Sequence, residues 1–176
     1  MRNALRLAAI TGAIVAAACT KGESTAATTR RAPLAVGATA PRFAVKSLTG
    51  DSLVIADANS GVTLLNVWAT WCTSCKEEFS ELERYRKTFS ANGLHVVAIS
   101  VDQGSDVKVR KFVEAQGSQF PVAHDADARI SSLYGVNGLP TSYLLDAHGK
   151  VLWTAIGDFR LDSAGMANAI DRALAK

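Results

Sequence analysis

The stretch LLNVWATWCTSCKEE at residues 64–78 joins two different sequence patterns. Its first part belongs to an apolar, β-rich run at residues 62–68, which is typical of a strand buried on both faces of a parallel sheet. Its second part opens a segment in which apolar residues recur at intervals of three and four between charged ones. The recurring residues are Phe79, Leu82, Tyr85 and Phe89. The stretch therefore predicts a buried strand that leads directly into an amphipathic helix.

Two cysteines, Cys72 and Cys75, lie at the junction between this strand and this helix. At the start of a helix this spacing places both sulfur atoms on one face and within reach of a disulfide bond. Unpaired backbone N–H groups and the positive end of the helix dipole favour a thiolate at Cys72 and raise its nucleophilicity. The pattern predicts a redox pair in which Cys72 attacks and Cys75 resolves.

A zinc site would be a different use of the same cysteines. Zinc needs two further ligands, and the remaining candidates, Cys19, His95, His124 and His148, show no ligand spacing. We expect His95 to be a core residue of a buried strand, and His124 and His148 to lie in solvated turns. The sequence therefore predicts no metal ion.

The rest of the folded chain supplies short elements, and the complete order is βαβα(α)ββα. The predicted elements are a hairpin of residues 42–45 and 52–55, the strand 62–68 and its helix, a strand at 94–101, a helix carrying Val109, Phe112 and Val113, a short helix at 126–134, a hairpin of 141–145 and 151–154, and a final helix lined by Met166, Ile170, Ala173 and Leu174. This order predicts an α/β sandwich with a mixed sheet and helices on both faces.

The N-terminal segment, residues 1–18, has the organisation of a signal peptide. Arg2 and Arg6 precede an apolar run that is too short to cross a bilayer as a helix. Small residues then precede Cys19, and this ending resembles a bacterial lipobox, whose cysteine carries a lipid. The alternative is simple cleavage, which would leave Cys19 as an unpaired thiol in an oxidising compartment. We favour lipidation at Cys19 and a periplasmic, membrane-anchored protein.

Composition limits the partners. Residues 19–33 are mostly small, polar or charged and predict a flexible tether, and residues 34–176 then form one domain. The chain has 19 Lys and Arg against 16 Asp and Glu, and loss of Arg2 and Arg6 with the signal peptide leaves 17 against 16. A nearly neutral protein with scattered charges is unsuited to binding nucleic acid. We expect a protein or a small molecule as the partner.

Three segments together resemble thioredoxin-fold proteins of the TlpA/ResA type, including the DsbE-like reductases of cytochrome c biogenesis. They are LLNVWATWCTSCKEE at residues 64–78, Val36-Gly37 with Pro41 and Phe43, and YGVNGLPT at residues 134–141 followed by Leu144-Leu145-Asp146 and Gly149. The resemblance covers residues 34–175. It implies a thioredoxin fold, with a central mixed β-sheet flanked by helices and an N-terminal β-hairpin extension.

The resemblance also assigns roles to residues around the cysteines. In the family a cis-proline faces the cysteine pair, and Pro140 matches it. A cis bond there would leave the backbone of Leu139 open to an extended substrate segment. Trp71 either shields the sulfur atoms and contacts partners, or is a partly buried aromatic that anchors its loop.

Glu78 matches an acidic residue of the family, three positions after the second cysteine. It lies one helical turn beyond Cys75 and borders the apolar stripe, so partial burial would raise its pKa and allow proton exchange with Cys75. The alternative is an exposed helix glutamate, like Glu77. Thioredoxins proper carry an acid where this chain has Asn66, so we expect no proton route there.

The direction of electron flow follows from the resemblance, which implies a reductase of protein disulfides. The dipeptide Thr73-Ser74 between the cysteines lacks the histidine that stabilises the thiolate in DsbA-like oxidants. We expect a monomer that receives electrons from a membrane thiol donor and acts on client disulfides, including those of apocytochrome c. Apart from the redox-active disulfide, no cofactor is expected.

Other classes fit less well. A peroxiredoxin needs Thr or Ser three positions before its cysteine and Pro seven before, where this chain has Ala69 and Leu65. A copper chaperone of the Sco type separates its cysteines by three residues and adds a histidine, for which His124 or His148 is a candidate. A thioredoxin-like module without catalytic activity would not need an intact cysteine pair and proline.

Overall fold

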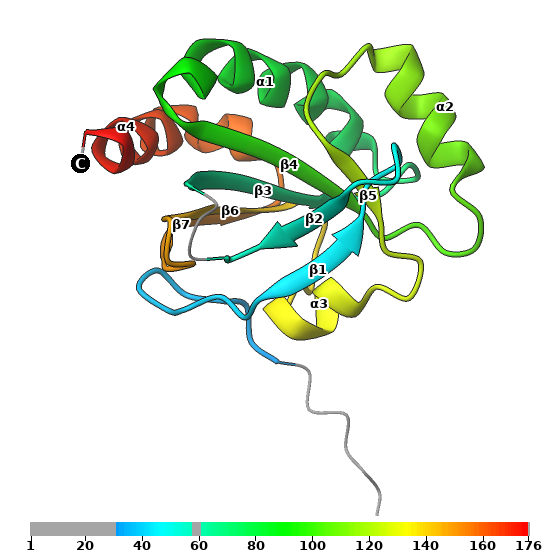
Figure 1. Cartoon of the computed structure of the whole chain (residues 1–176), viewed down its shortest axis with the longest axis horizontal. Helices are drawn as coiled ribbons and strands as arrows, with labels where there is room; N and C mark the ends of the chain where they lie inside the picture. The colour runs from blue at the N-terminus through cyan, green and yellow to red at the C-terminus, as the bar shows by residue number, and fades with distance from the viewer. Residues whose placement is uncertain (1–30, 58–60, 176) are drawn as a thin grey trace, which may run out of the picture.

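A five-stranded mixed sheet in the order β5-β4-β3-β6-β7 forms the centre of the computed structural model, which describes residues 31–57 and 61–175 (Figure 1). Its strands are β3 (Val62–Trp68), β4 (Leu94–Ser100), β5 (Val122–His124), β6 (Thr141–Leu145) and β7 (Val151–Ile156). β3 pairs with β4 in parallel and with β6 in antiparallel orientation, so the predicted mixed sheet is confirmed. The predicted signal peptide and Cys19 lie outside the described residues.

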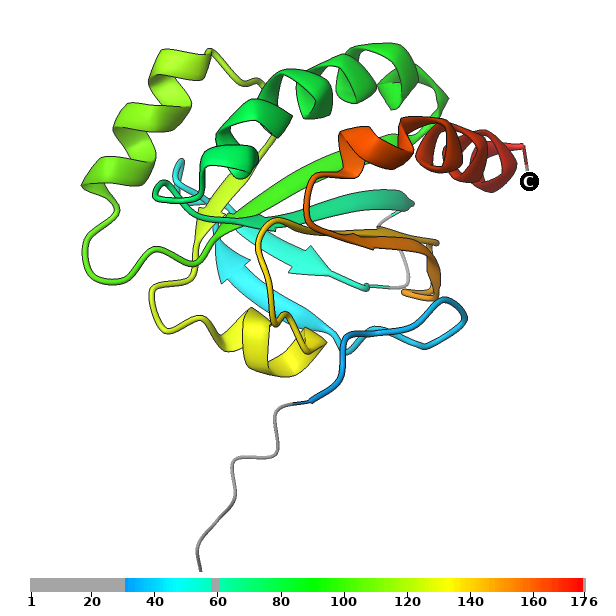
Figure 2. The same cartoon turned by 180° about the vertical axis from the view of Figure 1, so that it is seen from behind.

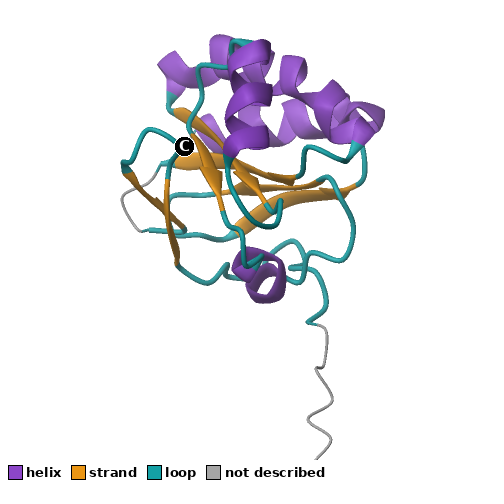
Figure 3. Cartoon of the chain, turned by 90° about the vertical axis from the view of Figure 1, so that its right-hand side faces the viewer, coloured by secondary structure: helices purple, strands orange, loops and turns teal. Residues whose placement is uncertain are grey.

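Helices cover both faces of the sheet, as predicted. α1 (Thr73–Phe89), α2 (Val107–Gln116) and α4 (Ser163–Leu174) lie on one face, and α3 (Arg129–Tyr134) lies on the other beside the hairpin of β1 (Phe43–Lys46) and β2 (Ser52–Ile55) (Figures 2 and 3). In the described part of the chain, no helix combines the length and the apolar character that a membrane span requires.

Each face of the sheet has its own core because alternate strand residues point to opposite sides. On the α1 side the buried residues include Leu64, Trp68, Phe79, Leu82, Val109 and Ile170. On the hairpin side they include Phe43, Leu65, Val67, Ile99, Tyr134 and Tyr143. β3 contributes to both cores, which explains why apolar residues point to both of its faces.

Three local predictions need correction. β5 was not predicted as a strand, and it places His124 beside β4 rather than in a solvated turn. α3 begins at Arg129 rather than at residue 126, because Ala128 has a left-handed backbone (φ 49°) and the Asp125 carboxylate accepts from the N–H of Ile130 at 2.8 Å. His95 is exposed rather than a core residue, since β5 pairs only with the last part of β4 and a pocket lies beside His95.

Candidate active site

Cys72 and Cys75 form a disulfide bond at the start of α1, with their Cα atoms 5.3 Å apart. Cys72 has an extended backbone (φ −89°, ψ 112°) and caps the helix, and its sulfur accepts from the backbone N–H of Cys75 at 3.3 Å. The side chain of Ser74 lies 3.6 Å from the same sulfur. These donors stabilise negative charge on Cys72 when it is a thiolate.

The two sulfur-bearing residues differ in accessibility. Cys72 retains 8% of its surface, whereas Cys75 has none exposed, and both belong to the core that contains Phe79. An incoming disulfide therefore meets Cys72 first. This asymmetry agrees with the order of attack predicted from the sequence.

Trp71 is one of the most exposed large hydrophobic residues of the described chain, at 69%. It borders a pocket of about 610 Å³ that Asp102 and Lys108 also line. The loop before Cys72 is anchored by Thr70 instead, whose N–H and hydroxyl both donate to the Asp102 carboxylate. Trp71 therefore does not anchor its loop by burial, and its indole is available to a partner.

Asp102 is itself fixed from the end of β4. Its carboxylate accepts from the hydroxyl of Ser100 at 2.7 Å. Burial alone would raise the pKa of Asp102, but the hydrogen bonds from Thr70 and Ser100 outweigh it and hold that pKa below its ordinary value. The carboxylate thus remains charged and organises the loop that carries Trp71.

The Leu139–Pro140 peptide bond is cis, as the resemblance implied. Thr141, the next residue, pairs in antiparallel register with Val67 near the end of β3. Pro140 therefore lies at the same end of the strands as the loop that carries the cysteines. Pro140 is buried and its carbonyl accepts from the N–H of Gly157 at 2.7 Å. Leu139 is only half-buried, which leaves this segment open at the surface.

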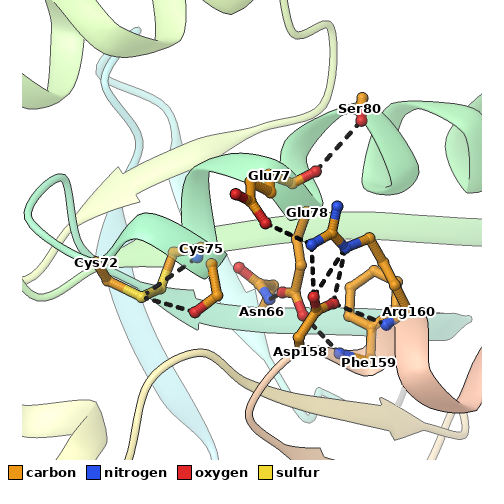
Figure 4. Close-up of polar contacts among 10 residues, drawn as sticks. Asn66, Cys72, Cys75, Glu77, Glu78, Ser80, Asp158, Phe159 and Arg160 are labelled. Carbon is orange, nitrogen blue, oxygen red and sulfur yellow. Dashed lines mark hydrogen bonds and ion pairs between the residues drawn. A yellow bond between two sulfur atoms is a disulfide. The ribbon is translucent and has the colours of Figure 1, made fainter.

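Glu78 has no exposed surface, so it is not the solvated helix residue that the alternative described. Its Oε1 accepts from the backbone N–H of Phe159 at 2.6 Å and its Oε2 from the side-chain amide of Asn66 at 3.0 Å (Figure 4). Burial disfavours the charged carboxylate and raises the pKa of Glu78 to about 8, although both hydrogen bonds and Arg160 oppose the rise. The group therefore changes charge near neutral pH.

Asn66 is a site residue whose role the sequence did not reveal. It is fully buried on β3, and its amide nitrogen donates both to Glu78 and, at 2.9 Å, to the hydroxyl of Ser142 on β6. Asn66 thus contacts Glu78, the buried group whose pKa is raised. No local pattern could have found this contact, because Ser142 is 76 positions away.

The turn after β7 was also missed. Arg160 contacts the carboxylates of Asp158 and Glu77, at 2.6 Å and 2.5 Å (Figure 4). Phe159 lies between Asp158 and Arg160 in the sequence. The short 3-10 helix η2 (Phe159–Asp162) that begins here leads into α4. Glu77 and Glu78 thus both connect α1 to this turn, one at the surface and one in the core.

The described residues contain no group of three or more His, Cys, Asp and Glu side chains that could hold a metal ion. His124, a candidate copper ligand in the sequence, places its Nε2 2.6 Å from the backbone carbonyl of Asp102. Its ring therefore fixes the strand end that carries Asp102.

Comparisons with known proteins agree with this geometry. The sequence model of the AhpC/TSA family matches residues 36–154. The thiol-disulfide oxidoreductase ResA of Bacillus anthracis is 36% identical over 123 residues, 70% of either chain, and ResA of Bacillus subtilis (strain 168) is 31% identical over 159 residues, 89% of this chain and 88% of the relative.

Solved structures place the fold in the same group. A thiol:disulfide interchange protein DsbE from Chlorobium tepidum superposes with a TM-score of 0.74 at 34% identity and covers 80% of this chain and 99% of its own. The sheet order, the hairpin and the cysteine pair at the start of α1 are those of the thioredoxin fold that the sequence predicted. The chain therefore belongs to the AhpC/TSA family and is a thiol-disulfide oxidoreductase of the ResA and DsbE type, with Cys72 and Cys75 as its cysteine pair.

Proposed function

We propose that the protein reduces disulfide bonds of client proteins outside the cytoplasm, with Cys72 as nucleophile and Cys75 as resolving thiol. The observation that carries the proposal is the asymmetry of the pair. Cys72 is the partly exposed, hydrogen-bonded sulfur at the helix cap, and Cys75 is fully buried one helical turn before Glu78. Nucleophile and proton acceptor are thereby separated along α1.

The reaction starts from the dithiol. The Cys72 thiolate attacks one sulfur of the client disulfide, a mixed disulfide forms, and the client's other sulfur leaves as a thiolate that takes up a proton. Cys75 then loses its proton and attacks Cys72, so that the Cys72–Cys75 disulfide forms and the second client sulfur leaves as a thiolate, which takes up a proton from solvent. Two electrons pass to the client, and a membrane thiol donor restores the dithiol.

Glu78 is the proposed acceptor for the proton of Cys75. An ionised Glu78 takes the proton as Cys75 attacks, and in the disulfide form its pKa of about 8 keeps the carboxyl protonated at neutral pH. The same proton is available to the Cys75 thiolate when the disulfide is reduced again. Glu78 thereby couples the transfer of a proton to the oxidation and reduction of the cysteine pair.

The client is proposed to bind between Trp71 and the cis-proline segment. Leu139 is half-buried next to Pro140, where an extended chain can add to its backbone, and Trp71, directly before Cys72, offers an exposed indole. Such binding uses backbone contacts and one apolar surface, which suits several clients. Apocytochrome c, whose cysteines must be reduced before haem attachment, is the client class that we propose.

The proposed location rests on the N-terminal sequence. Residues 1–18 are proposed as a signal peptide and Cys19 as the site of a lipid anchor, which would hold a monomer at the periplasmic side of a membrane, near its electron donor. Besides the redox-active disulfide, the proposed reaction needs no cofactor.

A peroxidase reaction is not favoured by the residues around Cys72. Leu65 and Ala69, at the positions where a peroxiredoxin carries its proline and hydroxyl residue, are apolar and fully buried in the core on the hairpin side. Neither side chain can donate a hydrogen bond to a peroxide.

The proposal is tested by trapping the mixed disulfide. In a chain with Cys19→Ser, Cys75→Ser should accumulate a covalent complex with a protein disulfide such as that of insulin, which a thiol reductant releases, because no resolving thiol remains. Cys72→Ser should form no complex and should lose disulfide reductase activity. Full turnover by either variant would refute the assigned roles, and Ser132→Ala, an exposed change on α3 that keeps both thiols, is the matched control.

A further inference from the structure

The turn that follows β7 places an amide directly against Glu78. The Phe159 side chain is 1% exposed and packs in the same core as Phe79 and Tyr85. With its ring fixed, its backbone N–H donates to Glu78 Oε1 at 2.6 Å. The turn is therefore part of the environment of Glu78.

Arg160 links this turn to α1. Its guanidinium binds the Asp158 carboxylate through Nε at 2.9 Å and Nη2 at 2.6 Å, and it reaches Glu77 with the same Nη2 at 2.5 Å (Figure 4). The side chains of Arg160 and Glu77 are 38% and 52% exposed, and ion pairs at such exposure contribute little to folding stability. Folding stability therefore does not explain this linkage, and its side chains lie near Glu78 (Figure 4).

The charges that act on Glu78 come from this turn. On α1 itself, Cys75 is bonded to Cys72 and Glu77 is paired with Arg160. β3 and β6 contribute only uncharged groups, Asn66 and Ser142. Among the described residues, the charged groups that shift the pKa of Glu78 are Asp158, which raises it, and Arg160, which lowers it.

We propose that Arg160 and Asp158 are positioning residues that set the proton affinity of Glu78 in opposite directions. The inference extends the proposed function, in which Glu78 exchanges a proton with Cys75. Arg160 stabilises the ionised carboxylate directly and also neutralises Asp158, so its loss removes a nearby cation and exposes a nearby anion. Loss of the Asp158 charge leaves the cation and removes the anion.

The test is the titration of Glu78 in the disulfide form of the full chain, followed by NMR of ¹³C-labelled glutamate carboxyl groups, with Glu78→Gln to assign the signal. Arg160→Gln should raise the titration midpoint by roughly half a pH unit or more, and Asp158→Asn should lower it, which is the scale of one unit charge acting at short range. Arg160→Lys keeps the cation and should return the midpoint towards that of the parent protein.

The matched control is Arg84→Gln, which breaks an exposed ion pair with Glu81 on the same helix and should leave the midpoint unchanged. If the turn acted only by holding Phe159 in place, both Arg160→Gln and Asp158→Asn would weaken the Phe159 hydrogen bond and raise the midpoint. Shifts in the same direction, or a shift as large in Arg84→Gln, would overturn the proposal.

This titration needs no client and no turnover, so it is independent of the proposed function. The pH profile of client reduction is measured on the same variants. Opposite shifts in the titration with an unchanged pH profile would support the positioning role of Arg160 and Asp158, and would remove Glu78 from the reaction.

Discussion

Glu78 is held in the core by hydrogen bonds from an amide side chain and a backbone N–H, without a directly bonded cation. Its folded pKa of about 8 lies above its ordinary value of 4.5, so between these pH values the folded protein binds a proton that the unfolded chain has released. The free energy of unfolding therefore falls as pH rises through this window. Below this window Glu78 is protonated in both states and does not change the free energy of unfolding with pH. Above the window it is ionised in both states, and the free energy of unfolding has fallen by the full amount.

Replacement of Glu78 by Gln removes this dependence while it keeps the size of the side chain. We compare the free energy of unfolding of Glu78→Gln with that of the parent protein, both in the disulfide form. The difference should shift in favour of the variant by an amount on the order of 4 kcal/mol from pH 4 to pH 9, as linkage gives for a pKa shift of this size. Urea denaturation at both pH values measures it, with the exposed Glu114→Gln as control. An equal difference between variant and parent at both pH values would contradict a raised pKa of the buried Glu78 carboxyl.

Sequence reasoning could identify a site residue only where a local motif or the family resemblance pointed to it. The spacing of Cys72 and Cys75 at a strand-to-helix junction predicted a redox pair, whereas Glu78 and Pro140 were named because they match positions of the family. The part played by Asn66 was missed since it depends on groups that only the fold brings together. Arg160 was missed for the same reason: it reaches Glu77 across 83 positions.

At the scale of elements, α1 is positioned by an aromatic cluster beneath it. Phe79 has its ring centroid 4.5 Å from that of Trp68 on β3, 4.9 Å from Phe112 on α2 and 5.4 Å from Phe120 before β5. One side chain of the active-site helix therefore contacts three other parts of the chain. The cluster fixes how the helix start, and with it Cys72, is presented at the end of the sheet.

Truncation of this side chain should be costly. Phe79→Ala should lower the free energy of unfolding by about 3–5 kcal/mol, as loss of a buried phenylalanine does, whereas Lys87→Ala on the exposed face of the same helix should change it by less than about 0.5 kcal/mol. Chemical denaturation of the oxidised protein measures both. Similar losses in the two variants would show that the cluster does not position α1.

The elements that the sequence predicted are those with a full period of hydrophobic pattern. β3 and α1 are long enough to show theirs, whereas β5 has three residues and exists because it pairs with β4 at Ala98, Ile99 and Ser100. α3 was predicted too long because its start is set by the left-handed backbone of Ala128, which apolar periodicity does not report. Tertiary pairing and single backbone angles decided what the pattern could not.

In the whole molecule, the three cysteines are predicted to have two different roles. Cys72 and Cys75 are paired within the fold, and Cys19 is predicted to carry a lipid. Cys19→Ser should move the mature protein from the membrane fraction to the soluble fraction, because the signal peptide would be removed and no lipid added. Cell fractionation measures it, with Cys72→Ser as a control that loses a thiol and should stay with the membrane. Continued membrane association of Cys19→Ser would contradict the anchor.

A Cys72–Cys75 couple that donates electrons to client disulfides must have a low reduction potential. The measurement equilibrates the purified chain carrying Cys19→Ser with defined thiol buffers and quantifies the free thiols of the pair. For a reductase we expect a potential at or below about −230 mV, on the thioredoxin side of the known range. A potential near −120 mV, the value of disulfide-forming oxidants, would contradict it.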